Sequence, residues 1–197
     1  MTLDARTAAL RALPLDQLRR RSSTKWRTYP DDVLPLFVAE TDFPLADAIT
    51  ERLRAAVELG DTGYTPPDPG IRDAFVAFAQ RRFGWSVQPA RVRSTCDVMM
   101  GVVEILRAVH APGDRVIVAP PVYPPFFDCV EEAGGVVERV PLIDVDGSWS
   151  LDLDGIERAL AGGARAVLLC NPHNPTGTVH SRAMLARLAE IAAAHGA

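Results

Sequence analysis

Residues 166–177 read AVLLCNPHNPTG, an apolar run that passes directly into a turn rich in asparagine and proline. A run of five apolar residues bounded by turn residues is typical of a strand in a buried parallel sheet. The two Asn-Pro pairs and Gly177 indicate a rigid turn, which lets the side-chain amides of Asn171 and Asn174 point into a crevice. A tight turn without any ligand is the alternative interpretation.

Short apolar runs alternate with helical patterns over much of the chain, from residue 91 onward. Two further runs, 115–119 and 136–140, predict strands. Segments with helical spacing predict helices, at 46–59, 71–84, 98–110, 124–133, 152–161 and about 181–195. Strands that alternate with helices in this way predict an α/β fold with a mostly parallel sheet, whose ligands bind at the carboxyl ends of the strands.

Two more segments carry candidate binding residues. Residues 120–127 (PPVYPPFF) follow a predicted strand, and the prolines on both sides of Tyr123 limit the freedom of its ring, which suits a flat aromatic ligand. Residues 94–97 (STCD) lead into a predicted helix that begins near Val98, and backbone N–H groups at a helix N-terminus can bind phosphate. The alternatives are a core position for Tyr123 and a capping role alone for Asp97.

Composition excludes several classes of partner. The 197 residues are 48% apolar and carry a net charge of −4, so the chain can form a core but offers no basic surface to nucleic acid or to anionic lipid. Charged residues interrupt every apolar stretch before it reaches the length of a membrane span, and we expect a cytoplasmic protein that binds neither membrane nor nucleic acid.

The titratable and nucleophilic side chains show no metal-binding spacing, so no metal site is expected. The three cysteines form no C-x-x-C pair and are expected to be buried free thiols, at Cys96, Cys129 and Cys170. His173 either lines a pocket or faces solvent. Lys25 is the only lysine of the sequence, and its place beside Trp26 in an Arg-rich N-terminal segment predicts a surface cation without a catalytic role.

The Asn-Pro-x-Asn-Pro-Thr-Gly motif, the Pro-x-Tyr-Pro-x-Phe loop and the helix-opening turn, in this order, resemble the fold-type I pyridoxal-phosphate enzymes of aminotransferase class I and II. Within them, Lys25-Trp26, the stretch LFVAETDFP at 36–44 and Gly63-Tyr64-Thr65 are similar to the cystathionine β-lyase branch of the MalY/PatB type. The resemblance runs from about residue 22 to the end. It implies a three-layer α/β/α large domain, here only its N-terminal part at 31–197, preceded by an arm at 1–30.

The resemblance also implies roles in binding pyridoxal 5′-phosphate. Tyr123 would stack on the pyridine ring and Asn174 would hydrogen-bond the ring hydroxyl oxygen. The backbone at Asp97 and Val98 would hold the phosphate, and Tyr64 would reach the phosphate of a neighbouring subunit in a homodimer. The Asp97 carboxylate departs from the usual small, uncharged turn and would repel a phosphate dianion unless it turns away to cap the helix.

The substrate implied by the resemblance is a small amino acid, whose carboxylate would lie beside Ala39 and Glu40. Glu40 and Thr41 stand where the family usually has Asp-Met, so the substrate preference of the family is not carried over to this chain. The implied reaction is that of a carbon–sulfur β-lyase, which converts L-cystathionine to homocysteine, pyruvate and ammonia.

No catalytic residue is expected within these 197 residues. The family's Schiff-base lysine, the acid that pairs with the pyridine nitrogen and the substrate-clamping arginine are all expected beyond the last residue. An inactive fragment of an aminotransferase and a non-catalytic binding module are the alternatives.

Overall fold

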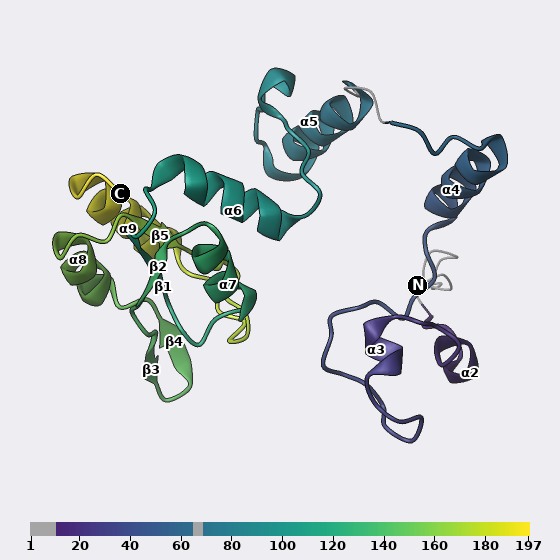
Figure 1. Ribbon diagram of the computed structural model, residues 1–197, viewed down its shortest axis with the longest axis horizontal. Helices are drawn as coiled ribbons and strands as arrows, with labels where there is room; N and C mark the ends of the chain where they lie inside the picture. The colour runs from purple at the N-terminus through teal and green to yellow at the C-terminus, as the bar shows by residue number, and fades with distance from the viewer. Residues whose placement is uncertain (1–10, 65–68) are drawn as a thin grey trace, which may run out of the picture. The chain divides into compact units, whose positions relative to one another are not determined.

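The computed structural model describes residues 11–64 and 69–197 (Figure 1). The chain divides into an N-terminal unit, Met1–Asp68, and a C-terminal unit, Pro69–Ala197. The described part of the N-terminal unit contains three helices, α2 (Leu15–Leu18), α3 (Thr24–Arg27) and α4 (Asp47–Leu59). Helix α4 ends at Leu59, and Gly60 follows as its C-cap, where a φ of 70° gives the left-handed conformation that glycine adopts most readily.

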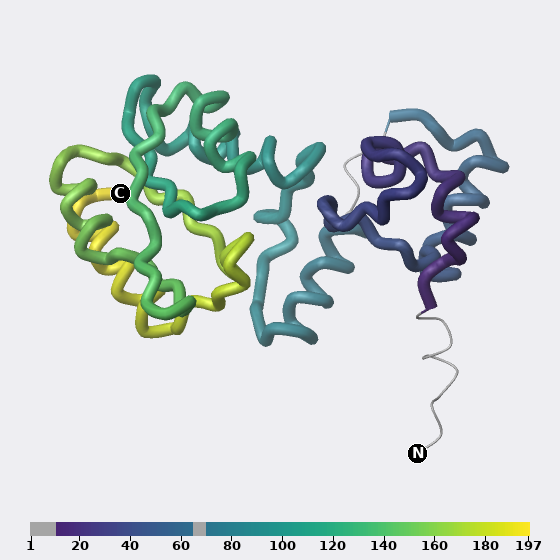
Figure 2. Tube along the Cα trace, turned by 90° about the horizontal axis from the view of Figure 1, so that it is seen from below, coloured from purple at the N-terminus to yellow at the C-terminus, as the bar shows by residue number. Residues whose placement is uncertain are grey.

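The C-terminal unit contains the α/β part of the chain, and Figure 2 traces its path. It begins with α5 (Pro69–Phe83) and the 3₁₀ helix η1 (Pro89–Arg91). The remaining elements follow in chain order: α6 (Val98–Val109), β1 (Arg115–Val118), α7 (Pro125–Glu132), β2 (Val136–Arg139), β3 (Ile143–Val145), β4 (Ser148–Ser150), α8 (Leu153–Ala161), β5 (Ala166–Leu168) and α9 (Arg182–Ala194). Every helix and strand predicted from apolar spacing is confirmed to within about two residues at each end.

The main sheet has the strand order β2-β1-β5, and both pairings are parallel. Val116 of β1 lies opposite Val137 of β2 on one side and Ala166 of β5 on the other. A separate antiparallel hairpin, β3–β4, was not predicted, and its turn contains Asp146 and Gly147 with φ of 53° and 79°. An Asp-Gly pair with positive φ at both residues is a common two-residue hairpin turn.

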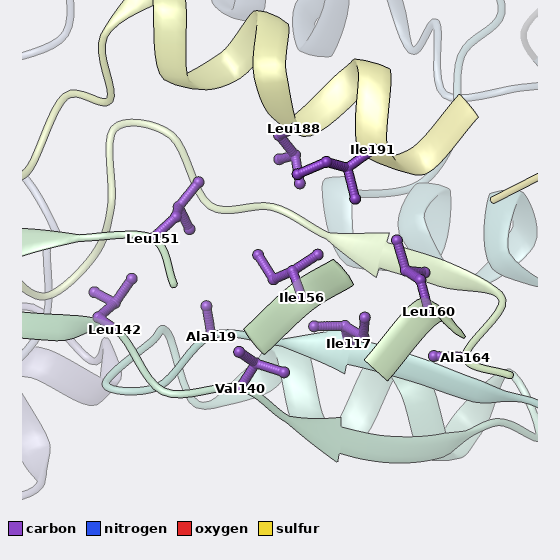
Figure 3. Close-up of a cluster of buried hydrophobic side chains, with 10 residues drawn as sticks. All are labelled: Ile117, Ala119, Val140, Leu142, Leu151, Ile156, Leu160, Ala164, Leu188 and Ile191. Atoms are coloured by element: carbon purple, nitrogen blue, oxygen red, sulfur yellow. The ribbon is translucent and has the colours of Figure 1, made fainter. Parts of the chain in front are cut away.

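Helices cover both faces of the main sheet, because successive side chains of a strand point to opposite faces. Val116 and Val118 pack on one face with buried residues of α6 and α7, among them Val103 and Val130. Ile117 packs on the other face in a second cluster with α8 and α9, which Figure 3 shows. The two clusters confirm the predicted three-layer α/β/α arrangement.

The described helices include none that is both long and apolar enough to cross a membrane. The prediction of buried thiols holds for Cys129 alone, since Cys96 is exposed and Cys170 is half-buried. Cys96 lies in the exposed turn before α6, where the chain offers no apolar cover.

Candidate functional site

Two candidate residues follow neighbouring strands of the main sheet. Tyr123 follows β1 and Asn174 follows β5, and these strands run parallel to each other, so both loops leave the sheet at the same edge. Tyr123 is 38% exposed, and its ring is nearly perpendicular to the Phe126 ring, with the centroids 6.2 Å apart. Part of the Tyr123 ring is therefore open to a ligand.

The loop that carries Asn174 is fixed by its own backbone. His173 N donates to Thr178 O at 2.7 Å, and Gly177 N donates to His173 O at 2.7 Å. The Asn174 backbone N–H donates to the Cys170 sulfur at 3.3 Å, whereas its exposed side-chain amide has no hydrogen bond within the described ranges. This amide is thus held in place at its backbone and free at its tip, as a ligand-binding group must be.

His173 joins this loop to the loop of Tyr123. Its imidazole is buried, and Nε2 lies 3.0 Å from the carbonyl oxygen of Pro121. The solvent-facing alternative for His173 is therefore wrong, because the ring fills the space between the two loops.

The turn before α6 has the properties of a phosphate site. Asp97 Oδ1 accepts a hydrogen bond from Met100 N at 2.8 Å, so the carboxylate caps the helix instead of facing a ligand. In the part of the chain that the structure describes, the N–H groups of Val98 and Met99 have no acceptor. These two donors lie at the positive end of the helix dipole, where an anion is stabilised.

The start of α6 lies beside the segment that carries Tyr123. Met99 packs in the same cluster as Val122 and Phe126, and the Cys129 thiol of α7 lies 3.8 Å from the Met99 carbonyl oxygen. Burial, with the nearby carboxylates of Asp128 and Asp97, raises the pKa of Cys129 above its ordinary value. The thiol is consequently neutral and acts here as a packing group.

Together these groups fit a flat aromatic molecule that carries a phosphate. The Tyr123 ring offers a stacking face, the Asn174 amide offers a donor, and the first N–H groups of α6 offer an anion site. A cavity of about 760 Å³ lies between α5 and η1. Its lining includes Ser94 and Thr95 but neither Tyr123 nor Asn174. The candidate site is therefore the strand-end edge and not this cavity.

The predicted substrate residues belong to the N-terminal unit. Ala39 is exposed, and Glu40 is half-buried with its Oε1 accepting a hydrogen bond from Ser23 Oγ at 2.5 Å. Tyr64 is fully exposed at the end of the described part of this unit. The roles of these three residues remain predictions.

Lys25 is buried, with 6% of its surface exposed, so the prediction of a surface cation is wrong. Its Nζ donates to Asp42 Oδ2 at 2.7 Å and to the Glu40 carbonyl oxygen at 2.9 Å. Trp26 is also buried, and its Nε1 donates to Asp42 Oδ1 at 3.2 Å. A buried ammonium is tolerated here because a carboxylate neutralises it.

The hydrogen bond and charge of Lys25 hold the pKa of Asp42 below its ordinary value, although partial burial opposes the shift. The Asp42 carboxylate is thus charged at neutral pH. The prediction that Lys25 has no catalytic role stays a prediction.

His180 was not predicted to have a role, and it is hydrogen-bonded to the loop that carries Asn174. Its Nε2 is 3.3 Å from His173 Nδ1, and its backbone N donates to Asn171 Oδ1 at 3.1 Å. Neither periodicity nor spacing indicates this contact, because it depends on how the loop folds back on itself.

Comparison with known proteins places this geometry in a family. Residues 32–197 match the family model described as aminotransferase class I and II. A relative from Mycobacterium leprae (strain TN) is 45% identical over 196 residues, which is 95% of this chain and 48% of the relative. The cystathionine beta-lyase of Corynebacterium glutamicum is 39% identical over 183 residues, 93% of this chain and 48% of that protein.

A solved structure agrees with these relatives. Cystalysin from Treponema denticola, whose crystal structure contains a pyridoxal 5′-phosphate cofactor, is 27% identical with a TM-score of 0.82 over 90% of this chain and 48% of that one. The chain spans about half the length of the curated relatives it matches. On the family match and the shared fold, the chain belongs to the aminotransferase class I and II family.

Proposed function

We propose that this chain forms the pyridoxal 5′-phosphate site of a carbon–sulfur β-lyase that converts L-cystathionine to homocysteine, pyruvate and ammonia. The observation that carries the proposal is that an aromatic ring and a free side-chain amide follow two neighbouring parallel strands, Tyr123 after β1 and Asn174 after β5. Relatives named cystathionine beta-lyase support the choice of reaction.

In this proposal each group of the strand-end site has one task. The Tyr123 ring stacks on the cofactor ring, and the Asn174 amide donates to the ring hydroxyl oxygen. The N–H groups of Val98 and Met99 bind the phosphate, while Asp97 keeps its carboxylate on the helix. Pyridoxal phosphate supplies the electron sink that stabilises the negative charge left when an amino acid loses its α-proton.

The remaining roles concern the whole protein. Ala39 and Glu40 lie beside the carboxylate of a small amino-acid substrate, and Tyr64 reaches the cofactor phosphate of a second subunit in a homodimer. Residues 31–197 belong to the large domain, with 1–30 as an arm, and the protein acts in the cytoplasm. Since Lys25 is the sequence's only lysine and is paired with Asp42, no residue of this chain supplies the Schiff-base lysine.

Binding of pyridoxamine 5′-phosphate to the purified chain tests the site. This ligand carries the ring and phosphate but cannot form a Schiff base with an amine, so its binding reports on the non-covalent site alone. Quenching of the protein's intrinsic fluorescence measures that binding. Tyr123→Leu and Asn174→Ala should each weaken binding by about tenfold, the effect of losing one stacking or hydrogen-bonding contact. Tyr29→Leu, at another exposed tyrosine, is the control and should leave binding unchanged.

Two results would contradict the proposal. One is the absence of binding by the unsubstituted chain, and the other is an equal loss in Tyr29→Leu and Tyr123→Leu. Borohydride reduction after addition of pyridoxal phosphate is a further check, because a pyridoxyl group on Lys25 would show that its pairing with Asp42 does not protect the amine.

An aminotransferase is the second candidate, and the matching family model favours it. Both reactions begin with loss of the same α-proton, so the strand-end site serves either one. An assay of the full-length gene product with L-cystathionine distinguishes the two reactions. Release of pyruvate and a thiol without a keto-acid acceptor indicates the lyase. Turnover that requires such an acceptor indicates the aminotransferase. A full-length product without a lysine ~40 residues beyond the Asn-Pro loop would instead support a non-catalytic binding module.

A further inference from the structure

His173 and His180 form a buried pair between the two loops of the candidate site. Their side chains are 1% and 4% exposed, and their rings meet edge to face with centroids 5.5 Å apart. His173 Nε2 lies 3.0 Å from the Pro121 carbonyl oxygen, and His180 Nε2 lies 3.3 Å from His173 Nδ1. The three groups make a continuous path from the start of α9 to the Tyr123 loop.

The chemistry of the two ends fixes the positions of the protons along this path. A carbonyl oxygen can only accept, so His173 Nε2 must carry the hydrogen that points at Pro121. The Nδ1 atom of a neutral His173 is then an acceptor, and His180 Nε2 donates to it. His180 Nδ1 is left as a buried lone pair with no partner among the described residues.

Burial favours this neutral arrangement. Desolvation and the neighbouring His173 lower the pKa of His180 below its ordinary value. A proton on His180 Nδ1 would be a charged donor in a buried position without an acceptor, which is costly. A metal site does not explain the pair, because no group of three or more metal-binding side chains occurs in the described ranges.

His173 is next to the residues that the cofactor site uses, and His180 contacts His173. His173 precedes Asn174 in the chain, and the carbonyl that it binds is two residues before Tyr123. The backbone N of His180 donates to Asn171 Oδ1 at 3.1 Å, so the histidine pair also holds the start of the Asn-Pro loop. A shift of the His173 ring would therefore move the Asn174 amide relative to the Tyr123 ring.

We propose that His173 and His180 are positioning residues, which hold the Asn174 loop and the Tyr123 loop in register so that both residues meet the same cofactor ring. This role rests on the proposed function, since it matters only if the strand-end edge binds pyridoxal phosphate. The role that it competes with is simple filling of the core between two loops.

The first test measures the tautomers in the ligand-free chain. A long-range ¹H–¹⁵N spectrum distinguishes a hydrogen on Nε2 from one on Nδ1. The hydrogen should lie on Nε2 in His173 and in His180, as the contacts of the two Nε2 atoms require. A hydrogen on His173 Nδ1, or a charged ring at either position, would overturn the arrangement.

The second test measures the affinity for pyridoxamine 5′-phosphate in matched variants. His173→Phe keeps a ring but removes the donor, and should weaken binding about tenfold, the effect of one buried hydrogen bond. His173→Gln places an amide N–H near the position of Nε2, and should stay within about threefold of the unsubstituted chain. His195→Gln, at the end of α9, is the control and should have no effect.

The outcomes separate the two proposals. Equal affinities in His173→Phe and the unsubstituted chain would overturn the positioning role alone, and so would a His173→Gln variant that binds as weakly as His173→Phe. Absence of binding by the unsubstituted chain would overturn the cofactor site and with it the positioning role, while the tautomer spectrum would still show whether the histidine pair forms.

Discussion

The Lys25 ammonium has a carboxylate and a carbonyl as its acceptors, and both belong to the segment that carries the predicted substrate residues. The bonds to Asp42 and to Glu40 O fix α3 to this segment. The ammonium also lies 5.6 Å from the centroid of the Trp26 ring, a favourable cation–π distance. The loss of either charge leaves the other without a counter-ion in a partly buried position.

Lys25→Met should therefore lower the free energy of unfolding by about 2 kcal/mol, below the cost of breaking a fully buried pair because Asp42 is partly exposed. Urea denaturation measures the change. Addition of Asp42→Asn should recover part of the loss, since it removes the orphaned charge. Arg20→Met, at an exposed neighbour, is the control with a change below about 0.5 kcal/mol, and an equal effect of the two methionine variants would contradict the buried pair.

The same pair predicts the direction of a pH dependence. The folded pKa of Asp42 lies below the ordinary value of 3.8, so the unfolded chain binds more protons between the two values. The stabilisation is complete above pH 3.8 and is lost as the pH falls through the folded pKa. The difference in stability between the unsubstituted chain and Lys25→Met should consequently narrow in acid, and a constant difference between pH 6 and pH 3 would contradict the assignment.

Among the helices, α8 shows how closely an element can be fitted to the sheet. Asp152 Oδ1 caps its first turn by accepting from Gly155 N at 2.8 Å. A Cβ added at Gly155 would lie 2.7 Å from Asp152 Cγ and 2.8 Å from Val140 Cγ1, closer than side-chain atoms approach each other. Glycine is therefore required here for close packing of the helix start against the sheet.

Gly155→Ala should lower the stability by about 2 kcal/mol through overpacking and loss of the cap. Thermal unfolding followed by circular dichroism measures the change. Gly63→Ala is the control, because a Cβ there meets no atom within 4 Å. Equal melting temperatures for Gly155→Ala and the unsubstituted chain would show that the start of α8 can shift to make room.

Local sequence patterns predict the elements in which buried positions recur at regular intervals along the chain. Strand β1 is an example, since its last three residues, Val116 to Val118, are apolar and buried between two covering layers. The β3–β4 hairpin escaped prediction because its strands have three residues each and β3 is exposed throughout, although the Asp-Gly pair of its turn is present in the sequence. Lys25 was misjudged for a different reason: its partner Asp42 is 17 residues away, and no local pattern reports such a contact.

For the candidate site, the sequence indicated Tyr123, Asn174 and the α6 N-terminus, because each lies at a recognisable boundary between elements. The side-chain direction of Asp97 could be stated only as a condition, and the structure meets it through the bond to Met100. His180 could not be found at all, since its place depends on the loop between β5 and α9.

At the scale of the whole molecule, the strand-end site and the proposed substrate residues belong to different units. Tyr123, Asn174 and the start of α6 all belong to the C-terminal unit, whereas Ala39 and Glu40 belong to the N-terminal unit. Changes at the Lys25–Asp42 pair should therefore alter substrate preference more than cofactor affinity. Pyridoxamine phosphate binding therefore reports mainly on the C-terminal unit, to which Tyr64 of the N-terminal unit would add a contact across a dimer.

Helix α4 carries exposed apolar side chains along one face. Ile49, Leu53 and Val57 are spaced by four residues along α4, so they share one face, and all three are exposed. An apolar stripe in water favours association, and we expect the purified chain to be poorly soluble or to form oligomers in sedimentation velocity. Leu53→Glu should shift the distribution toward monomer, whereas Arg52→Glu, at the neighbouring position on another face, should not. A monodisperse monomer of the unsubstituted chain would contradict the expectation, and equal distributions for the two glutamate variants would exclude this face of α4 as the cause.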